Sequence, residues 1–193
     1  MRLASPARTG EDRTASKNTT FGENDMSGYL ALAVTVGLLA VLDTWLYIGP
    51  LGTSLIAGLV WVSFIAWGCH FHSGGGIKGT TTTVACMIWG AVVGLGAVLL
   101  ATGPLAGLDA PVAFGIAVGL GAALICLSSK VPLLATIPAS VYGFASIAGA
   151  LPLHDGDPAA AIMPVAASII IGAIFGFVSE IVANALTKKA PEA

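Results

Sequence analysis

Six stretches of predominantly apolar residues follow one another along the chain, separated by short segments rich in Gly, Pro and polar residues. Each stretch holds about the 20 apolar residues that an α-helix needs to cross the hydrocarbon core of a bilayer. The predicted spans are Ser27–Ile48, Gly52–His72, Ile77–Thr102, Ala110–Ser128, Val131–Leu151 and Ala159–Leu186. The pattern therefore predicts an all-α, polytopic membrane protein with six transmembrane helices and no soluble domain.

The chain also matches itself without a gap when Ala31–Ala101 is shifted by 82 residues onto Ala113–Ala183. The two segments share 19 identities over 71 positions. Self-similarity of this length indicates a duplicated unit. Because each unit would cross the membrane three times, an odd number, the second copy is expected to be inverted relative to the first. We predict two inverted three-helix repeats, residues 27–103 and 109–187.

The composition agrees with a chain that lies almost entirely in the lipid bilayer. Hydrophobic residues make up 56% of the chain and charged residues 9%, whereas soluble domains carry about 25% charged residues. The formal net charge of −2 gives no reason to expect a nucleic-acid partner. The three cysteines lie in apolar runs, and their odd number argues against a disulfide framework.

The two ends of the chain differ from this apolar body. Residues 1–26 are polar, carry charges of both signs and lack the continuous apolar core of a signal peptide. We predict a disordered cytoplasmic tail there and a short cytoplasmic tail at residues 188–193. Met26, directly before the first predicted span, leaves a later start of translation open.

The basic residues determine the predicted orientation. If the N-terminus is cytoplasmic, every Lys and Arg lies on the cytoplasmic side: Arg2, Arg8, Arg13, Lys17, Lys78, Lys130, Lys188 and Lys189. The charged residues of the outer turns are then all acidic: Asp109, Asp155 and Asp157. This distribution follows the positive-inside rule, so both termini are predicted to be cytoplasmic.

Two acidic residues, Asp43 and Glu180, fall within the predicted spans, near opposite faces of the membrane. A charge at membrane depth costs about 2.5–3.5 kcal/mol on insertion scales, so such residues usually have a role. Asp43 is interpreted either as an acid that reaches the outer headgroups or as a carboxylate at the outer mouth of a pore. Glu180 is interpreted either as an acid near the inner interface or as a coupling group. The sequence shows no groups that would relay a proton between the two.

The turn between the second and third predicted spans contains three consecutive glycines and leads into a Thr-rich helix start. Glycine permits backbone conformations that are closed to other residues, so the segment either lines a cavity or forms a flexible turn. Hydroxyl and amide groups at the positive end of a helix would suit a carbonyl or an anion. The residues assigned here to a solute path are Gly74, Gly75, Gly76, Lys78, Thr80 and Thr81.

Histidines stand beside two turns that the 82-residue shift makes equivalent. His72 falls on His154, which is followed by Asp155, and we predict that these residues flank the two mouths of the path. His70 and His72 do not predict a metal site, because side chains two positions apart on a helix point away from each other. Trp67 is interpreted as an anchor at the membrane interface.

Four glycines form two equivalent patterns in the third and sixth predicted spans. Small residues four positions apart let helices approach closely. We predict that the two repeats touch near the midplane through Gly90, Gly94, Gly172 and Gly176.

Residues 27–187 resemble the YcdZ-like bacterial inner-membrane proteins. The resemblance is carried by the Gly-Gly-Ile-Lys-Gly run at Gly75–Gly79 and by Ile170, Gly172 and Gly176 in the sixth span. It implies six spans and a place in the bacterial cytoplasmic (inner) membrane, but it implies no substrate.

No phosphate-binding loop, zinc-protease motif or nucleophile with a neighbouring base is present in the sequence, so we predict neither an enzyme nor a cofactor. The first expectation is a homo-oligomeric channel or facilitator for a small polar or weakly charged solute, with its path between the two repeats. One alternative is a secondary transporter that uses Asp43 or Glu180 for proton or cation coupling. Another is a non-conducting partner that assembles with or regulates a second membrane protein.

Overall fold

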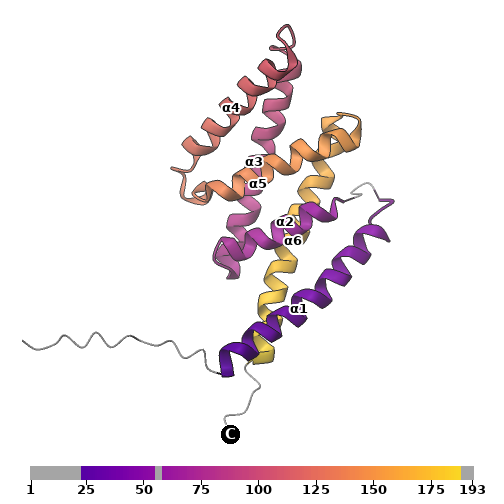
Figure 1. Ribbon diagram of the computed structural model, residues 1–193, viewed down its shortest axis with the longest axis vertical. Helices are drawn as coiled ribbons and strands as arrows, with labels where there is room; N and C mark the ends of the chain where they lie inside the picture. Colours follow the sequence, from indigo (N-terminus) through magenta and orange to yellow (C-terminus); the bar gives the residue numbers. More distant parts are fainter. Residues whose placement is uncertain (1–22, 55–57, 188–193) are drawn as a thin grey trace, which may run out of the picture.

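The computed structural model describes residues 23–54 and 58–187, so most of the predicted N-terminal tail and all of residues 188–193 lie outside it. Within these residues the protein is all-α, as predicted, and contains no strand. The helices are α1 (Glu23–Ile48), α2 (Val60–His72), α3 (Gly76–Thr102), α4 (Ala110–Ser128), α5 (Ile137–Ala150) and α6 (Pro158–Thr187), with short 3₁₀ turns η1 (Pro132–Leu134) and η2 (Leu151–His154) on either side of α5 (Figure 1).

Four helices are long and apolar enough to cross a membrane: residues Gly28–Ile48 of α1, and α3, α4 and α6. Their apolar side chains remain exposed along most of α1 and α4, where no other part of the described chain covers them. Exposed apolar surface of this extent is stable in lipid and not in water. The chain is therefore a multi-pass membrane protein.

The other two helices are shorter than the sequence predicts. Of the predicted span Gly52–His72, residues 55–57 lie outside the described residues, and the helix α2 begins at Val60 and has 13 residues. The predicted span Val131–Leu151 is helical only in α5, which has 14 residues and begins with a proline in its first turn. At 1.5 Å per residue each helix is about 20 Å long, less than the hydrocarbon core. The structure thus has four long helices and two short ones instead of six full spans among the residues it describes.

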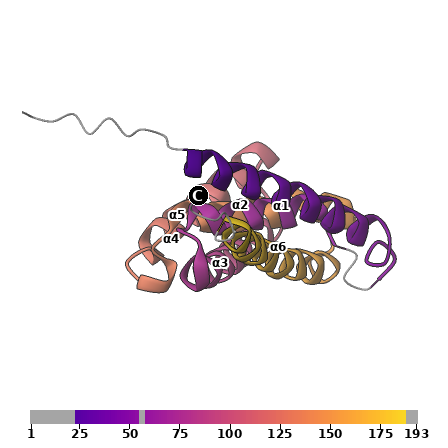
Figure 2. The same ribbon diagram turned by 90° about the horizontal axis from the view of Figure 1, so that it is seen from below.

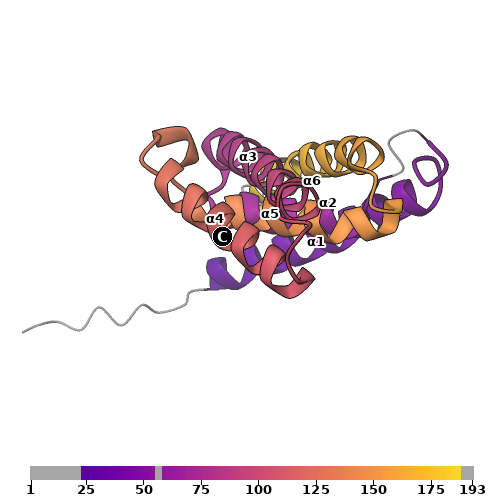
Figure 3. The same ribbon diagram turned by 90° about the horizontal axis from the view of Figure 1, so that it is seen from above.

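The short helices pack across the long ones. α2 lies against α6, and α5 lies against α3, while α1 and α4 cover α6 and α3 respectively (Figure 1). Viewed from either end of the molecule, α3 and α6 lie together on one side and α1 lies on the other (Figures 2 and 3). The start of α1 lies beside the end of α6: the Thr187 methyl is 3.8 Å from the position that a Cβ would occupy at Gly28.

The two crossings are built in the same way. A Cβ at Gly172 of α6 would overlap the backbone of Ser63 in α2, and a Cβ at Gly90 of α3 would overlap the backbone of Ser140 in α5. One turn further along, Gly176 and Gly94 make the corresponding contacts with α2 and α5. Glycine thus lets the helix backbones touch, as it does in tightly packed membrane helices.

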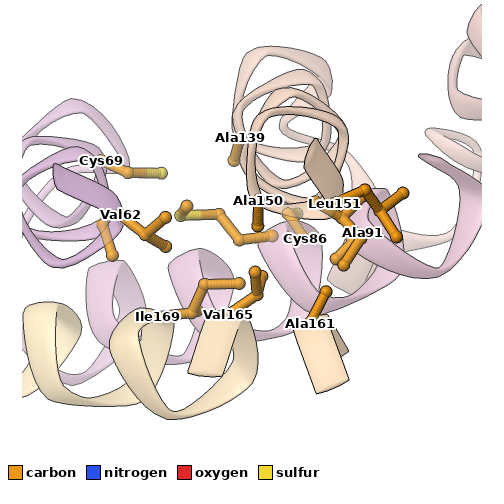
Figure 4. Close-up of a cluster of buried hydrophobic side chains, with 13 residues drawn as sticks. Val62, Cys69, Cys86, Ala91, Ala139, Ala150, Leu151, Ala161, Val165 and Ile169 are labelled. Atoms are coloured by element: carbon orange, nitrogen blue, oxygen red, sulfur yellow. The ribbon is translucent and has the colours of Figure 1, made fainter. Parts of the chain in front are cut away.

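An apolar core fills the space between the two crossings. Side chains from α2, α3, α5 and α6 converge there, and Figure 4 shows Val62, Val165 and Ile169 turned toward the same centre. Met87 and Ile147 belong to the same cluster and are fully buried. The space between the two predicted repeats is therefore occupied by packed side chains.

Candidate functional site

Three polar side chains meet where α2 turns into α3. The Nε2 atom of His70 lies 3.0 Å from Oε2 of Glu180, and the Thr80 hydroxyl lies 3.1 Å from the other ring nitrogen. The backbone N–H of Gly76, in the first turn of α3, donates to the same Glu180 oxygen at 2.6 Å. His70 is fully buried, whereas the Glu180 side chain is 33% exposed. The Glu180 carboxylate therefore occupies the positive helix end that the sequence suggested for a bound anion.

This cluster has two consistent proton arrangements. In one, a neutral His70 donates from Nε2 to Glu180 and accepts a hydrogen bond from the Thr80 hydroxyl at Nδ1. In the other, a protonated His70 donates from both nitrogens, and Thr80 donates to the carbonyl oxygen of Gly76 at 2.9 Å. The difference between the arrangements is one proton on the imidazole. The Thr80 hydroxyl proton is donated to His70 in the first arrangement and to Gly76 in the second.

The glycines of the turn make this arrangement sterically possible. Gly74, Gly75 and Gly76 all have positive φ, at 96°, 69° and 59°, a conformation that other residues rarely adopt. A Cβ at Gly75 would lie 2.9 Å from Oε2 of Glu180. Gly74, Gly75 and Gly76, the last of which is the first residue of α3, therefore form a tight turn that brings the N-terminal end of α3 onto the carboxylate.

A second polar cluster lies at the other end of the α2–α6 interface. Asp43 of α1 is fully buried, and one of its oxygens accepts a hydrogen bond of 3.2 Å from the Ser63 hydroxyl. Tyr47 stands four residues after Asp43 on the same face of α1, and its ring and the Ser168 hydroxyl, which lies 3.1 Å away, both approach the position that a Cβ would occupy at Gly58. Within the described part of the chain, Oδ2 of Asp43 and the Tyr47 hydroxyl oxygen have no hydrogen-bond partner. A buried carboxylate with one hydrogen bond is costly, so this cluster is expected to have a role beyond packing.

The same interface links the two clusters. Ser63 and His70 stand on one face of α2, seven residues or about 10 Å apart. Between them the Trp67 indole N–H donates to the Ser179 hydroxyl of α6 at 3.0 Å. Trp67 is buried, so its interpretation as an interfacial anchor was wrong. Polar groups that the sequence did not reveal thus lie between Asp43 and Glu180.

The α3–α5 crossing has the same backbone contacts and a different polarity. Ser140 stands where Ser63 stands, but its buried hydroxyl has no partner within the described residues. Ile147 stands at the place of His70, with its Cγ2 atom 2.6 Å from the position of a Cβ at Gly94. Buried carboxylate and imidazole groups are therefore found in the α2–α6 crossing and not in the described α3–α5 crossing.

The structure brings together only some of the residues assigned to a solute path. Glu180, Gly75, Gly76 and Thr80 meet in one cluster, and Gly74 lies in the same turn.

The remaining predicted residues lie apart from that cluster. Lys78 and Thr81 are exposed, and the Thr81 hydroxyl donates to backbone carbonyl groups of its own helix. His72 is exposed and meets the ring of Tyr142 edge to face. His154 and the exposed Asp155 lie near the end of α5, where Nδ1 of His154 contacts the carbonyl oxygen of Ala150.

The expected equivalence of His72 and His154 was wrong in this packing. Gly90 and Gly172 are 82 positions apart, but the residues they touch, Ser63 and Ser140, are 77 apart. Four of these five residues lie in the link between α5 and α6, which includes η2 and is longer than the link between α2 and α3, and the fifth lies in α5 after Ser140. His154 belongs to that longer link and has no counterpart at the end of α2.

Sequence reasoning missed His70, the central residue of the first cluster. A histidine near a predicted membrane interface is common, and its spacing from His72 argued against a metal site. One signal was available, because Ser63 and His70 fall on the same helical face as small residues such as Ala66. The sequence also shows no nucleophile beside a base, yet the fold places the Thr80 hydroxyl beside His70. That hydroxyl also bonds to the carbonyl one turn earlier, which is ordinary for Thr in a helix.

Comparison with known families gives one match. Residues 33–184 match the model of a family described as protein of unknown function (DUF1097). The chain belongs to this family. No curated protein and no solved structure matches it.

Proposed function

We propose that this protein is a secondary transporter that moves a small polar or weakly charged solute in step with a proton or cation. The path would follow the α2–α6 interface, with Asp43 and Glu180 at its two ends. The resemblance to the YcdZ-like proteins supports a place in the bacterial inner membrane, and the distribution of basic residues supports cytoplasmic termini.

The observation that carries this proposal is the difference in polarity between two crossings of the same design. In the register of the glycine contacts, Ser63 and His70 correspond to Ser140 and Ile147. In the 82-residue register, Asp43 and Glu180 correspond to Ile125 and Val98. Because the α3–α5 crossing packs without charged groups, packing does not require them in the α2–α6 crossing. Charged groups that are costly in a membrane and unnecessary for packing favour a role in transport.

A duplicated architecture suggests how such a transporter would move. We propose that residues 27–103 and 109–187 form two inverted repeats, since α2 and α5 make matching contacts with the long helix of the other repeat. Inverted repeats commonly move against each other around a central site. The apolar core between the crossings would then close the path in the conformation seen here, and tilting of the repeats would open it.

Transport assays in proteoliposomes test the proposal. Uptake of urea, ammonium, formate or acetate is measured together with the luminal pH, with imposed gradients of protons or of sodium ions. Glu180→Gln and Ser63→Ala should reduce coupled uptake, and Ser140→Ala is the matched control because it removes a buried serine hydroxyl from the other crossing. Wild-type flux equal to that of empty vesicles would contradict the proposal. Equal effects of Ser63→Ala and Ser140→Ala would remove its main support.

The same assays distinguish the proposed transporter from two other functions. A facilitator without coupling would keep full solute flux in Glu180→Gln under every gradient. A non-conducting partner protein is favoured by the packed apolar centre and by an apolar groove of about 510 Å³ beside α3, α4 and α5, lined by residues such as Leu99, Phe114 and Pro152. Folded protein without any flux would favour this last function.

A further inference from the structure

We propose that Asp43, Tyr47, Ser63 and Ser168 form a binding site for a dehydrated sodium ion. The proposal deepens the proposed function and rests on it only for the physiological role of the ion, because ion binding is measurable without transport.

The first argument is the number of unsatisfied oxygen atoms that the fold places together. Asp43 is 0% exposed and Tyr47 is 4% exposed, yet Oδ2 of Asp43 and the Tyr47 hydroxyl have no hydrogen-bond partner within the described residues. Buried polar atoms are almost always paired, and two unpaired atoms in one cluster point to a missing partner. A cation bound in this cluster would give both oxygens a partner.

The second argument is charge. Asp43 is the one acidic residue of the cluster, and when it is ionised its neutral partner Ser63 does not balance its charge. The lysines among the described residues, Lys78 and Lys130, lie at the start of α3 and after the end of α4. One buried negative charge in an apolar setting needs one positive charge to balance it. A monovalent cation provides this balance, whereas a divalent cation would leave an excess positive charge.

The third argument is the chemistry of the donor groups. One carboxylate and three hydroxyl groups offer oxygen atoms and no nitrogen or sulfur, which suits a hard cation rather than zinc or copper. Ser63 donates its proton to Oδ1 of Asp43, and Ser168 accepts the backbone N–H of Leu59 at 2.9 Å. Each serine oxygen keeps a lone pair for an ion after these bonds are made.

The fourth argument is that the donor groups are held in place. The backbone of Ser63 touches Gly172, and the Tyr47 ring lies against Gly58, where a Cβ would overlap ring atoms. Ser168 Oγ lies 3.1 Å from that same Cβ position. These contacts hold the four side chains in place, and we propose sodium as the small monovalent ion that they bind. The α3–α5 crossing offers no such set, because Ile125 and Cys86 stand where the 82-residue register places Asp43 and Ser168.

Direct binding of radioactive sodium to the purified full chain in detergent tests this site, with choline chloride to hold the ionic strength constant. We expect saturable binding that lithium competes for more strongly than potassium does. Asp43→Asn should abolish binding. Tyr47→Phe and Ser168→Ala should each weaken binding by about fivefold, which corresponds to about 1 kcal/mol, since each removes one oxygen ligand. Ser140→Ala should bind as the wild type does.

Thermal unfolding keeps the test valid if Asp43→Asn folds poorly. Sodium should raise the unfolding temperature of the wild type and of Ser140→Ala relative to choline, and raise that of Tyr47→Phe less. Absence of saturable sodium binding by the wild type would overturn the proposal, and so would binding that Tyr47→Phe and Ser168→Ala leave unchanged. Proton-coupled uptake without sodium binding would overturn the sodium site and leave the proposed function standing. Sodium binding without any solute flux would support the site and contradict the proposed function.

Discussion

Removal of the Glu180 carboxylate distinguishes a structural contact from a charge-dependent one. Both the His70 ring and the Gly76 N–H bind the same oxygen, Oε2, at 3.0 Å and 2.6 Å. Glu180→Gln keeps a carbonyl oxygen at that place and removes the negative charge. Glu180→Ala removes the acceptor and leaves the fully buried His70 without its partner. The alanine variant should therefore be less stable than the glutamine variant.

The size of each effect follows from the two bonds. A hydrogen bond to a charged group is worth about 1.5–3 kcal/mol and a neutral one about 0.5–1.5 kcal/mol. The change to glutamine thus costs about 1 kcal/mol for each bond, and the total is less than 2 kcal/mol because Glu180 is partly exposed. Leaving a buried donor unpaired costs a further 1–3 kcal/mol or so, which the alanine variant bears at His70.

Chemical unfolding in detergent measures this difference. The order of stability should be wild type, then Glu180→Gln, then Glu180→Ala. A double-mutant cycle with His70→Ala should give a coupling energy of about 1 kcal/mol or more between the two side chains. Equal stability of the glutamine and alanine variants, or no coupling to His70, would refute the argument that Oε2 holds the end of α2 against α3.

Three further predictions use glycine, tryptophan and cysteine residues. Gly172→Ala should lower the unfolding temperature because its Cβ would overlap the backbone of Ser63. Gly119 has open space around it, so Gly119→Ala should leave the stability unchanged or raise it by up to about 1 kcal/mol. Equal effects of the two substitutions would contradict the close crossing of α2 and α6. Trp67→Phe loses the hydrogen bond to Ser179 and should lower the free energy of unfolding by about 1 kcal/mol. A variant as stable as the wild type would contradict this. A maleimide should label the exposed Cys126 much faster than the buried Cys69 and Cys86, as mass spectrometry of labelled peptides would show; equal labelling rates would contradict the packing of the core.

The sequence predicted the long helices well because their apolar length and their ends are local properties. The predicted span Ala110–Ser128 is identical to α4, and the predicted third span begins one residue after α3 does. The short helices α2 and α5 were predicted too long. Apolar composition continues through the residues before them, and composition alone does not locate the first residue of a helix.

From the sequence, candidate functional residues could be predicted only where a residue is of a type that is costly to place in a membrane. Glu180 and Asp43 stood out because a charge at membrane depth is rare. Their partners did not, since His70 and Ser63 meet them only through packing of α2 against helices from distant parts of the sequence. The shift of five residues between the two crossings was hidden as well, because it arises mainly from the length of a link and leaves the glycine patterns aligned.

The pairing of α2 with α6 also has a consequence for synthesis in the cell. The ribosome completes α2 at residue 72 and α6 at residue 187. At about 5–20 residues per second, α2 waits on the order of ten seconds for the helix that will cover it. During that interval Ser63, Trp67 and His70 lack their α6 neighbours while they enter the bilayer. A membrane insertase or chaperone that shields a polar helix face is therefore expected to hold the half-made chain until translation ends.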